Sequence, residues 1–578
     1  MLSNEQGSLV ESSQQPSLFE RLDKLNEFDR EPVTPDRFES PRHFAAVFAG
    51  EHVAGTEFVI GALFVSWGVG TRDLILGLLI GNLLAVLAWT LICAPIAVQT
   101  RLTLYWYLGR IAGPVVTAIY NVVNAILFCG LAGAMITVSA SAVRIPFGIP
   151  PQTEWYPTDL RFVLVVVAVG LVVVAFAILG FRRLAQFSTI CVPWIFVIFF
   201  AGALAVLPQL TAGTPGVCSI QGLEDLWRLA DTSIWVGRED SDFTFWHVTA
   251  FALLANLAFH VGLSDMALLR YAPRASYGLF SACGMYMGHF LVWLASGMMG
   301  AGAALMLKTP LSSLDSGEVA YQALGGAGAL CVIVSGWATS NPTLYRAGLA
   351  LQVVTPGWPR WLVTLLAGMA TVTIACFPYI FRYLLEYAGT FAILMAPIAA
   401  VVFVEHWIFP PLGLRRYWFG QSGKVVNWAA LASWIIVVVF CFSAWRWELM
   451  HVVFIAIPGW VLTAVLYTMF AAMAGARGEA SRAPSTSDLE STPHLIAPSP
   501  THDSSTKSPQ SALQIALAVI GVLALAACIA LAVWVGLAGE EGYPQNLDTF
   551  KTYLAVASIV HLAAGTIWVL RIEQAEGN

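Results

Sequence analysis

Three short stretches place polar and ionisable side chains inside otherwise apolar runs: residues 51–57 (EHVAGTE), 256–265 (NLAFHVGLSD) and 336–342 (GWATSNP). Hydrocarbon contains no water, so such groups must face protein, an ion or a solvated cavity. Hydroxyl and carbonyl oxygens suit a hard cation, and carboxylates and imidazoles suit a proton or a polar solute. The alternative for 336–342 is structural, since Ser and Thr often join membrane helices.

The elements that position these stretches are predicted from composition. The chain has 578 residues, of which 58% are hydrophobic and 11% are charged. Soluble domains carry about 25% charged residues, so a multispanning membrane protein is indicated. We expect about fourteen spans, each long enough to cross a bilayer, near 44–67, 73–97, 111–143, 161–180, 186–208, 244–263, 276–306, 326–352, 360–378, 380–405, 425–444, 451–474, 512–538 and 550–570.

Basic residues predict the orientation. Lys and Arg gather at alternate connections, which share one side if the amino terminus is cytoplasmic, as the positive-inside rule requires. Arg346 is counted among them, and Glu51 is expected to reach water at the same side. We therefore predict a multi-pass protein of the cell (inner) membrane with both termini cytoplasmic. The residues on which this rests are Arg101, Arg110, Arg182, Arg183, Arg270, Arg274, Arg346, Arg360, Arg415, Arg416, Lys424, Arg477 and Arg482.

Four regions follow from the composition. Residues 1–43 lack the apolar core of a signal peptide and read as a cytoplasmic tail. Residues 44–474 form a twelve-helix core, and 475–510, rich in Ser, Thr and Pro, form a flexible cytoplasmic linker. Residues 511–578 add a two-helix extension, which we expect to lie outside the main bundle and to serve homo-oligomerisation or a partner. The nine cysteines show no disulfide or metal-ligand spacing.

Glu57 is the sharpest ionisable candidate because apolar sequence continues beyond it. An ionisable group in a span costs at least about 2.5–3.5 kcal/mol and normally faces the bundle interior. The alternative for Glu57 is a neutral, hydrogen-bonded packing role, and His260 is open to the same alternative. Spans 1 and 6 correspond if spans 1–5 and 6–10 form inverted halves, and interrupted helices at matching positions indicate a transporter's binding site.

Several segments together resemble the purine–cytosine permeases of the nucleobase–cation symporter family. They are 73–82 (DLILGLLIGN), 100–103 (TRLT), 180–188 (GFRRLAQFS) with 192–193 (VP), 264–271 (SDMALLRY), 339–349 (TSNPTLYRAGL) and 396–397 (AP). This resemblance spans about 44–474. It implies an all-α membrane protein with a LeuT-type five-plus-five inverted repeat and two further helices.

The resemblance also implies a coupling-ion site for Na⁺ between spans 1 and 8. Carried over, its ligands are backbone carbonyls near Val53 and Thr56, the Gly336 carbonyl, and the hydroxyls of Thr339 and Ser340. The sequence leaves open whether sodium or a proton is used. No other cofactor is expected.

The predicted substrate site departs from the family pattern. Phe128 stands where a span 3 tryptophan is expected, and Asn256 falls near the span 6 aromatic position. These departures weaken a nucleobase as substrate more than they weaken transport. The candidate substrate-binding residues are Glu57, Phe128, Asn256, Phe259, His260 and Asn341.

The favoured function is a secondary-active symporter that moves a small polar solute, nucleobase-like or a related compound, by alternating access, driven by sodium or protons. Its partners are a small-molecule substrate and the lipid bilayer, with no nucleic acid. One alternative is a transporter-derived sensor that signals through the linker and the last two spans. Another is a polytopic membrane enzyme, for which Glu51 and His52 form the clearest acid–base pair; the main prediction is that the chain is not an enzyme.

Overall fold

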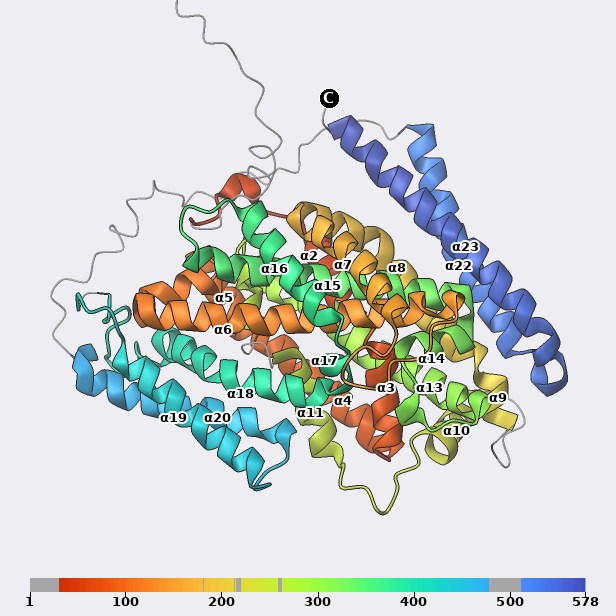
Figure 1. The fold of residues 1–578 in the computed structure, drawn as a ribbon, viewed down its shortest axis with the longest axis horizontal. Coiled ribbons are helices and arrows are strands. Elements are labelled where there is room, and N and C mark those ends of the chain that lie inside the picture. The colour runs from red at the N-terminus through yellow and green to blue at the C-terminus, as the bar shows by residue number, and fades with distance from the viewer. Residues whose placement is uncertain are drawn as a thin grey trace, which may run out of the picture.

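The computed structural model describes residues 31–576 apart from 180, 213, 215–219, 258–261, 421 and 478–510, and leaves side chains undescribed at 181–185, 256–257, 312, 539–541 and 573–576. The described residues form helices joined by turns and irregular connections, and none of them forms a named strand (Figure 1). The first half contains α2 (Pro41–His52), α3 (Glu57–Ser66), α4 (Thr71–Ala88), α5 (Ala94–Thr100), α6 (Leu104–Val143), α7 (Leu160–Ile178), α8 (Phe181–Ala205), α9 (Leu207–Ala212), α10 (Leu223–Leu229), α11 (Phe245–Leu257) and α12 (Met266–Leu269).

The second half continues with a π-helical segment, η7 (Cys283–Val292), which leads into α13 (Trp293–Leu307). The remaining helices are α14 (Ser316–Leu324), α15 (Gly326–Val354), α16 (Arg360–Ala375), α17 (Tyr379–Arg382), α18 (Leu384–Phe403), α19 (Trp428–Arg446), α20 (Val452–Ala471), α22 (Ala512–Gly536) and α23 (Gly539–Glu576).

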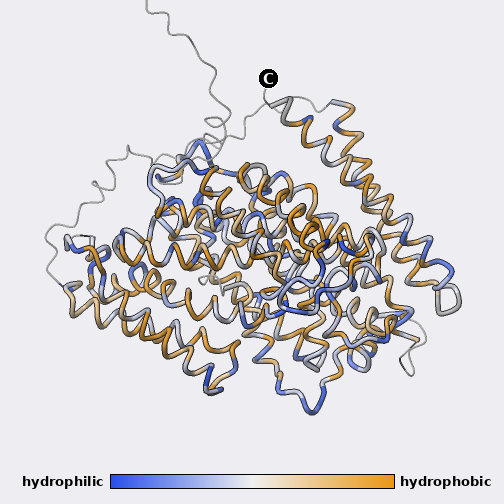
Figure 2. The backbone as a smooth tube through the Cα atoms, viewed as in Figure 1, coloured by the Kyte–Doolittle hydropathy of each residue, from blue (hydrophilic) through white to orange (hydrophobic). Residues whose placement is uncertain are grey.

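Each of the fourteen predicted runs contains helix, which confirms the all-α membrane class. In the described residues, ten helices are long and apolar enough to cross a membrane, and the bent pair α2 and α3 makes an eleventh span. The other three runs are α11 and α16, which are shorter apolar helices, and α15, which carries the polar cluster. In Figure 2 the hydrophobic colour follows the helices, and hydrophilic segments gather in the connections.

The centre of the bundle is the long helix α6, packed against α15. In its most apolar stretch, α6 is 89% buried inside the protein. It bends at Gly113, which directly precedes Pro114. The φ of Gly113, 78°, lies in the left-handed region. Because a bilayer is already spanned by about 20 residues, a 40-residue helix of this kind crosses obliquely or extends beyond it.

Span 1 breaks between α2 and α3, which meet at 51°. The connecting residues run from Val53 to Thr56, and Gly55 lies closely against two other helices. A Cβ at Gly55 would stand 2.9 Å from the Val138 side chain, 3.1 Å from the Val332 carbonyl oxygen and 3.2 Å from Ser335 Oγ. The absent side chain therefore lets the broken backbone contact both α6 and α15.

Span 6 is interrupted as predicted, whereas span 8 is not. Helix α11 ends at Leu257, and Gly262 has a left-handed φ of 80° before helix resumes towards α12. In contrast, α15 is one continuous helix through the polar cluster. The cluster interrupts the apolar pattern only. Pro342 has no N–H, so the Ala338 carbonyl one turn earlier loses its helical donor.

The carboxyl-terminal hairpin of α22 and α23 packs on the outer side of α8, at the edge of the bundle (Figure 1). His561 of α23 joins the three helices: its Nδ1 lies 3.0 Å from the Gly521 carbonyl oxygen, and its Nε2 lies 3.1 Å from that of Ile190. The hairpin thus contacts the core from its outer side, as an addition to the main bundle. The order of regions remains a prediction, since 478–510 fall outside the described residues.

Candidate substrate and ion site

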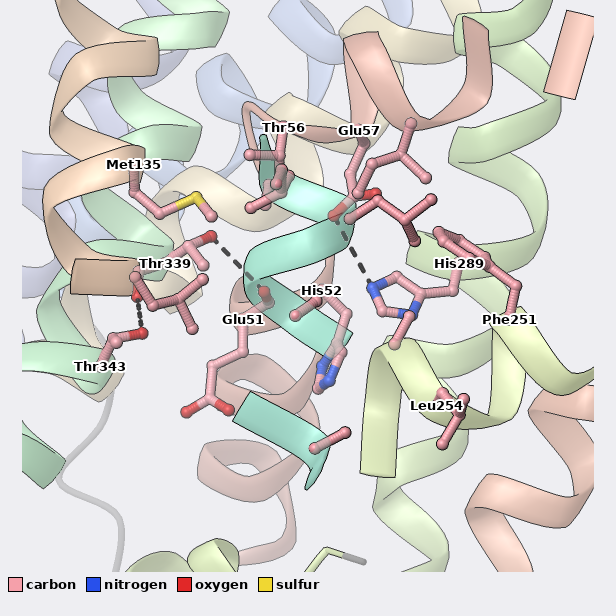
Figure 3. Close-up of a pocket in the computed structure, with 18 of the residues that line it drawn as sticks. Glu51, His52, Thr56, Glu57, Met135, Phe251, Leu254, His289, Thr339 and Thr343 are labelled. Atoms are coloured by element: carbon pink, nitrogen blue, oxygen red, sulfur yellow. Dashed lines mark hydrogen bonds and ion pairs between the residues drawn. The ribbon is translucent and has the colours of Figure 1, made fainter. Parts of the chain in front are cut away.

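A cavity of about 170 Å³ lies where the broken span 1 faces α6, α11, η7, α13 and α15 (Figure 3). It extends to the first turns of α18 and α20, where Leu384, Leu385, Val452 and Val453 line it. Its polar side chains include Glu51, His52, Thr56, Glu57, Ser264, Asp265, His289, Thr339, Thr343 and Arg346, and its aromatic walls are Trp89, Phe128, Phe251 and Trp293. A mostly apolar cavity with a few convergent polar groups is the usual form of a small-molecule site.

Glu57 is the first residue of α3 and is only 3% exposed. Trp293 Nε1 donates a hydrogen bond to Glu57 Oε2, and Oε1 lies 3.7 Å from His289 Nε2. Figure 3 shows the His289 ring directed toward this carboxyl group. The amino end of a helix carries partial positive charge, which favours a carboxylate at this position. Within the described chain, no Lys or Arg forms an ion pair with Glu57.

His289 and His52 lie side by side beneath Glu57. Their ring centroids are 4.9 Å apart, and the His289 ring stacks on Trp293 at 4.3 Å. His289 is 6% exposed, and its Nδ1 has no hydrogen-bond partner in the described structure. His52 Nδ1 lies 2.7 Å from its own helix's Phe48 carbonyl oxygen. The sequence did not single out His289, since one histidine in an apolar span gives no information about which helix it faces.

Three helices meet through Arg346 at the end of the cavity nearer the start of α2. Arg346 Nη2 lies 3.0 and 2.9 Å from the two Glu51 carboxylate oxygens and 2.5 Å from Asp265 Oδ1. Trp89 Nε1 donates to the other Asp265 oxygen at 2.5 Å. The side chains of Glu51, Asp265 and Arg346 are 9%, 5% and 6% exposed. The expectation that Glu51 reaches water is therefore wrong.

This ion-pair cluster also bears on the enzyme alternative. Both Glu51 oxygens accept from Arg346, and His52 Nδ1 is engaged by the Phe48 carbonyl. No hydrogen bond between Glu51 and His52 is present in the described structure. In this structure Glu51 is thus engaged by Arg346, and His52 by its own helix.

The face of α15 that meets span 1 carries residues at helical spacing. Thr339 Oγ1 lies 3.4 Å from the Glu51 carbonyl oxygen and 3.2 Å from that of Ser335, and Thr343 Oγ1 donates to the Thr339 carbonyl at 2.8 Å (Figure 3). Ser335 faces Gly55 one turn earlier, and Arg346 lies one turn later. Residues 335, 339, 343 and 346 recur every three or four positions and so share one face.

The predicted ion ligands separate into two groups. Thr56 and Thr339 line the cavity, whereas Val53, Gly336 and Ser340 do not. Gly336 lies against Ser139 of α6, and Ser340 Oγ lies 3.4 Å from its own helix's Trp337 carbonyl oxygen. Consecutive hydroxyls on a helix point in different directions, so Thr339 and Ser340 do not face span 1 together.

Of the predicted substrate residues, some line the cavity and others do not. Glu57 and Phe128 line the cavity, and the Phe128 ring packs edge-on to Phe391 at 5.4 Å. Asn341 is 2% exposed, is absent from the cavity lining, and its Oδ1 has no partner among the described residues. Asn256 lies in α11 with its side chain undescribed. Phe259 and His260 lie outside the described residues.

Solved structures of membrane transporters share this helix arrangement. One is Mhp1, a nucleobase-cation-symport-1 family transporter, in a closed conformation with bromovinylhydantoin bound. It is 13% identical in sequence and superposes with a TM-score of 0.60, and the alignment covers 79% of this chain and 98% of Mhp1. Inward-facing Mhp1 matches at 14% identity and TM-score 0.58, over 81% and 97% of the two chains.

An outward-open, substrate-bound Na⁺-coupled sialic acid symporter matches at 12% identity and TM-score 0.55, over 79% and 96% of the two chains. These likenesses confirm the LeuT-type fold that the sequence resemblance implied. No protein-family model matches the sequence, and no curated protein matches it.

Proposed function

We propose that this chain is a secondary-active symporter that moves a small polar solute by alternating access. The observation that carries the proposal is the cavity at the break of span 1, which is bounded by the interrupted span 6 and by the hydroxyl-bearing face of α15. Broken helices expose carbonyl groups and helix ends at mid-membrane, where transporters bind their substrates and ions. The fold that the chain shares with Na⁺-coupled symporters supports this function.

The membrane orientation is part of the proposal. With the amino terminus in the cytoplasm, the first turns of α18 and α20 lie toward the outside, and the cavity extends to them. The ion-pair cluster of Glu51, Asp265 and Arg346 then closes the cytoplasmic side. This arrangement corresponds to an outward-facing state, in which the solute enters between α18 and α20.

The coupling ion is proposed to bind where the carbonyl end of α2 faces Thr339. The end of a helix carries partial negative charge, and Thr339 adds a hydroxyl oxygen close to the Glu51 carbonyl. Oxygen ligands of this kind suit Na⁺. Thr56 contributes from the break, and Val53, Gly336 and Ser340 remain ligands to test. A proton carried by Glu57 is the competing driving ion.

For the solute, Glu57 and Phe128 are the proposed principal contacts, since both line the cavity. Asn256, Phe259, His260 and Asn341 complete the predicted set as candidates for mutagenesis. Uptake into proteoliposomes tests the whole proposal: the protein should accumulate a solute when a sodium or pH gradient is imposed and not without one. Accumulation that ignores both gradients would contradict symport.

A sensor remains the second candidate because the hairpin contacts the core. His561 bonds the hairpin to α8, and α8 packs against α2 next to the cavity. A change at the cavity can therefore reach α22 and α23 through one helix. Solute binding without flux, together with altered protection of the hairpin from hydrogen exchange, would favour this function over transport.

A further inference from the structure

We propose that the cavity selects a small organic cation, such as a protonated amine, amidine or guanidine, in preference to a neutral nucleobase-like solute. This inference rests on the proposed function and specifies its substrate class. It starts from the charged side chains that line the cavity: three carboxyl groups, from Glu51, Glu57 and Asp265, and one guanidinium, from Arg346.

The single guanidinium is already engaged. Arg346 pairs with both Glu51 and Asp265 through its Nη2, so two carboxylates balance its one positive charge. Glu57 has no Lys or Arg ion pair in the described structure; its polar neighbours are the Trp293 N–H, the Thr56 hydroxyl and the His289 ring. A buried carboxylate without a cation is costly, and a ligand that supplies the positive charge removes that cost.

The uncharged groups of the cavity favour the same ligand. With the proton of His289 on Nε2, facing Glu57, the lone pair of Nδ1 is an acceptor without a donor, on a side chain that is 6% exposed. The indole N–H groups of Trp89 and Trp293 donate to Asp265 and Glu57 and are thereby used. Around Glu57 the imidazole and indole groups therefore leave an acceptor free and no N–H free, which suits a ligand that carries several N–H groups.

The aromatic lining adds a third argument. Phe128, Phe251, Trp89 and Trp293 line the cavity, and the His289 ring stacks on one face of Trp293. The electron-rich face of an aromatic ring attracts a cation within about 6 Å, most strongly where water is excluded. A planar amidinium can thus contact a ring on its face while its N–H groups reach Glu57.

The test compares two probes of nearly equal shape, benzamidine and benzamide, of which only the first is a cation. Binding is measured by titration calorimetry with the purified full chain in lipid nanodiscs. We expect benzamidine to bind at least about tenfold more tightly than benzamide, as one charge-assisted contact to a carboxylate provides. Equal affinities, tighter binding of benzamide, or binding of neither probe would overturn the inference.

Three variants assign the preference to one residue. Glu57→Gln should abolish the preference for benzamidine, and Glu57→Asp, which keeps the charge, should retain it with weaker binding. Glu405→Gln is the matched control: Glu405 is also buried, 1% exposed, but bonds Tyr467 and the Tyr417 backbone outside the cavity. An unchanged preference in Glu57→Gln would overturn the role of Glu57.

Binding and flux separate this inference from the proposed function. A charge preference in binding, with no gradient-driven uptake of either probe or of other solutes, would contradict transport and leave the cation selectivity standing. Gradient-driven uptake of neutral solutes, with no preference between the probes, would contradict the cation selectivity and leave transport standing.

Discussion

Arg346 Nη2 lies within 3.0 Å of both carboxylate oxygens of Glu51, and this contact joins α15 to the amino-terminal half of the broken span 1. The same nitrogen reaches Asp265, which follows the interruption of span 6. One buried guanidinium therefore holds together the three segments that bound one end of the cavity. In alternating access, these segments must separate for the solute to leave on that side.

Replacing Arg346 by Gln should destabilise the protein strongly, since two buried carboxylates lose their partner. Breaking a buried ion pair by removing one member typically costs about 3–5 kcal/mol. Thermal unfolding in detergent would measure the loss. The triple variant Arg346→Gln, Glu51→Gln, Asp265→Asn removes all three charges and should recover most of it. A single variant as stable as the wild type would show that the cluster does not hold the helices together.

Replacing Thr339 by Val should weaken binding of Na⁺, because the change removes a hydroxyl and keeps the shape. A ligand that binds the folded state raises stability, by about 2.7 kcal/mol at one hundred times its Kd. The measurement is the thermal midpoint in NaCl against the same concentration of KCl. Ser340→Ala is the comparison, since Ser340 is the neighbouring candidate ligand and, unlike Thr339, does not line the cavity. A sodium effect lost in Ser340→Ala and kept in Thr339→Val would reverse the assignment.

Replacing Gly55 by Ala should strain the break in span 1. The added Cβ would meet the Val138 side chain at 2.9 Å and the Val332 carbonyl at 3.1 Å. Overpacking of this kind costs about 1–3 kcal/mol. Unfolding midpoints would report it, with Gly326→Ala as control because a Cβ there meets nothing within 4 Å. Equal unfolding midpoints for the two variants would show that the break in span 1 accommodates a Cβ at position 55 without strain.

Asp315 should make the free energy of unfolding of the protein depend on pH. This residue lies in the connection before α14, and burial raises its pKa above the usual 3.8, although Arg144 opposes part of the shift. The folded state then binds a proton more readily than the unfolded chain. The free energy of unfolding contributed by Asp315 should therefore rise as the pH falls through the raised pKa and level off below 3.8.

Asp315→Asn tests this expectation, since Asn also caps the start of a helix but does not titrate. Unfolding midpoints of the wild type and the variant, compared from neutral pH down to about pH 4, should show their difference change through that window. A difference that stays constant with pH would contradict the assignment.

The sequence was sufficient to predict the span ranges and the fold, because the apolar lengths and the family resemblance both depend on local pattern. It also identified Glu57, Phe128, Thr56 and Thr339, which line the cavity. In contrast, it missed the cluster around Arg346. A positive charge near a span end was interpreted as a marker of the cytoplasmic side.

The helical spacing of polar residues along α15 was sufficient to place Arg346 in the site. Ser335, Thr339, Thr343 and Arg346 recur every three or four residues, which places Arg346 on the same face as the hydroxyls. The partner helices are a different matter. That Glu51 and Asp265 meet this face, and that His289 meets Glu57, depends on how distant spans pack, and no local pattern in one sequence reports those contacts.

The most direct test of symport uses proteoliposomes exposed to a defined mixture of nucleobases, hydantoins, amines, amidines and amino acids. Mass spectrometry then reports which solutes accumulate under an imposed sodium gradient, under a pH gradient and under neither. We predict that at least one solute accumulates only when a gradient is present, and that Glu57→Gln reduces this accumulation while Glu405→Gln does not. Solutes that bind the purified protein but cross under neither gradient would contradict the account.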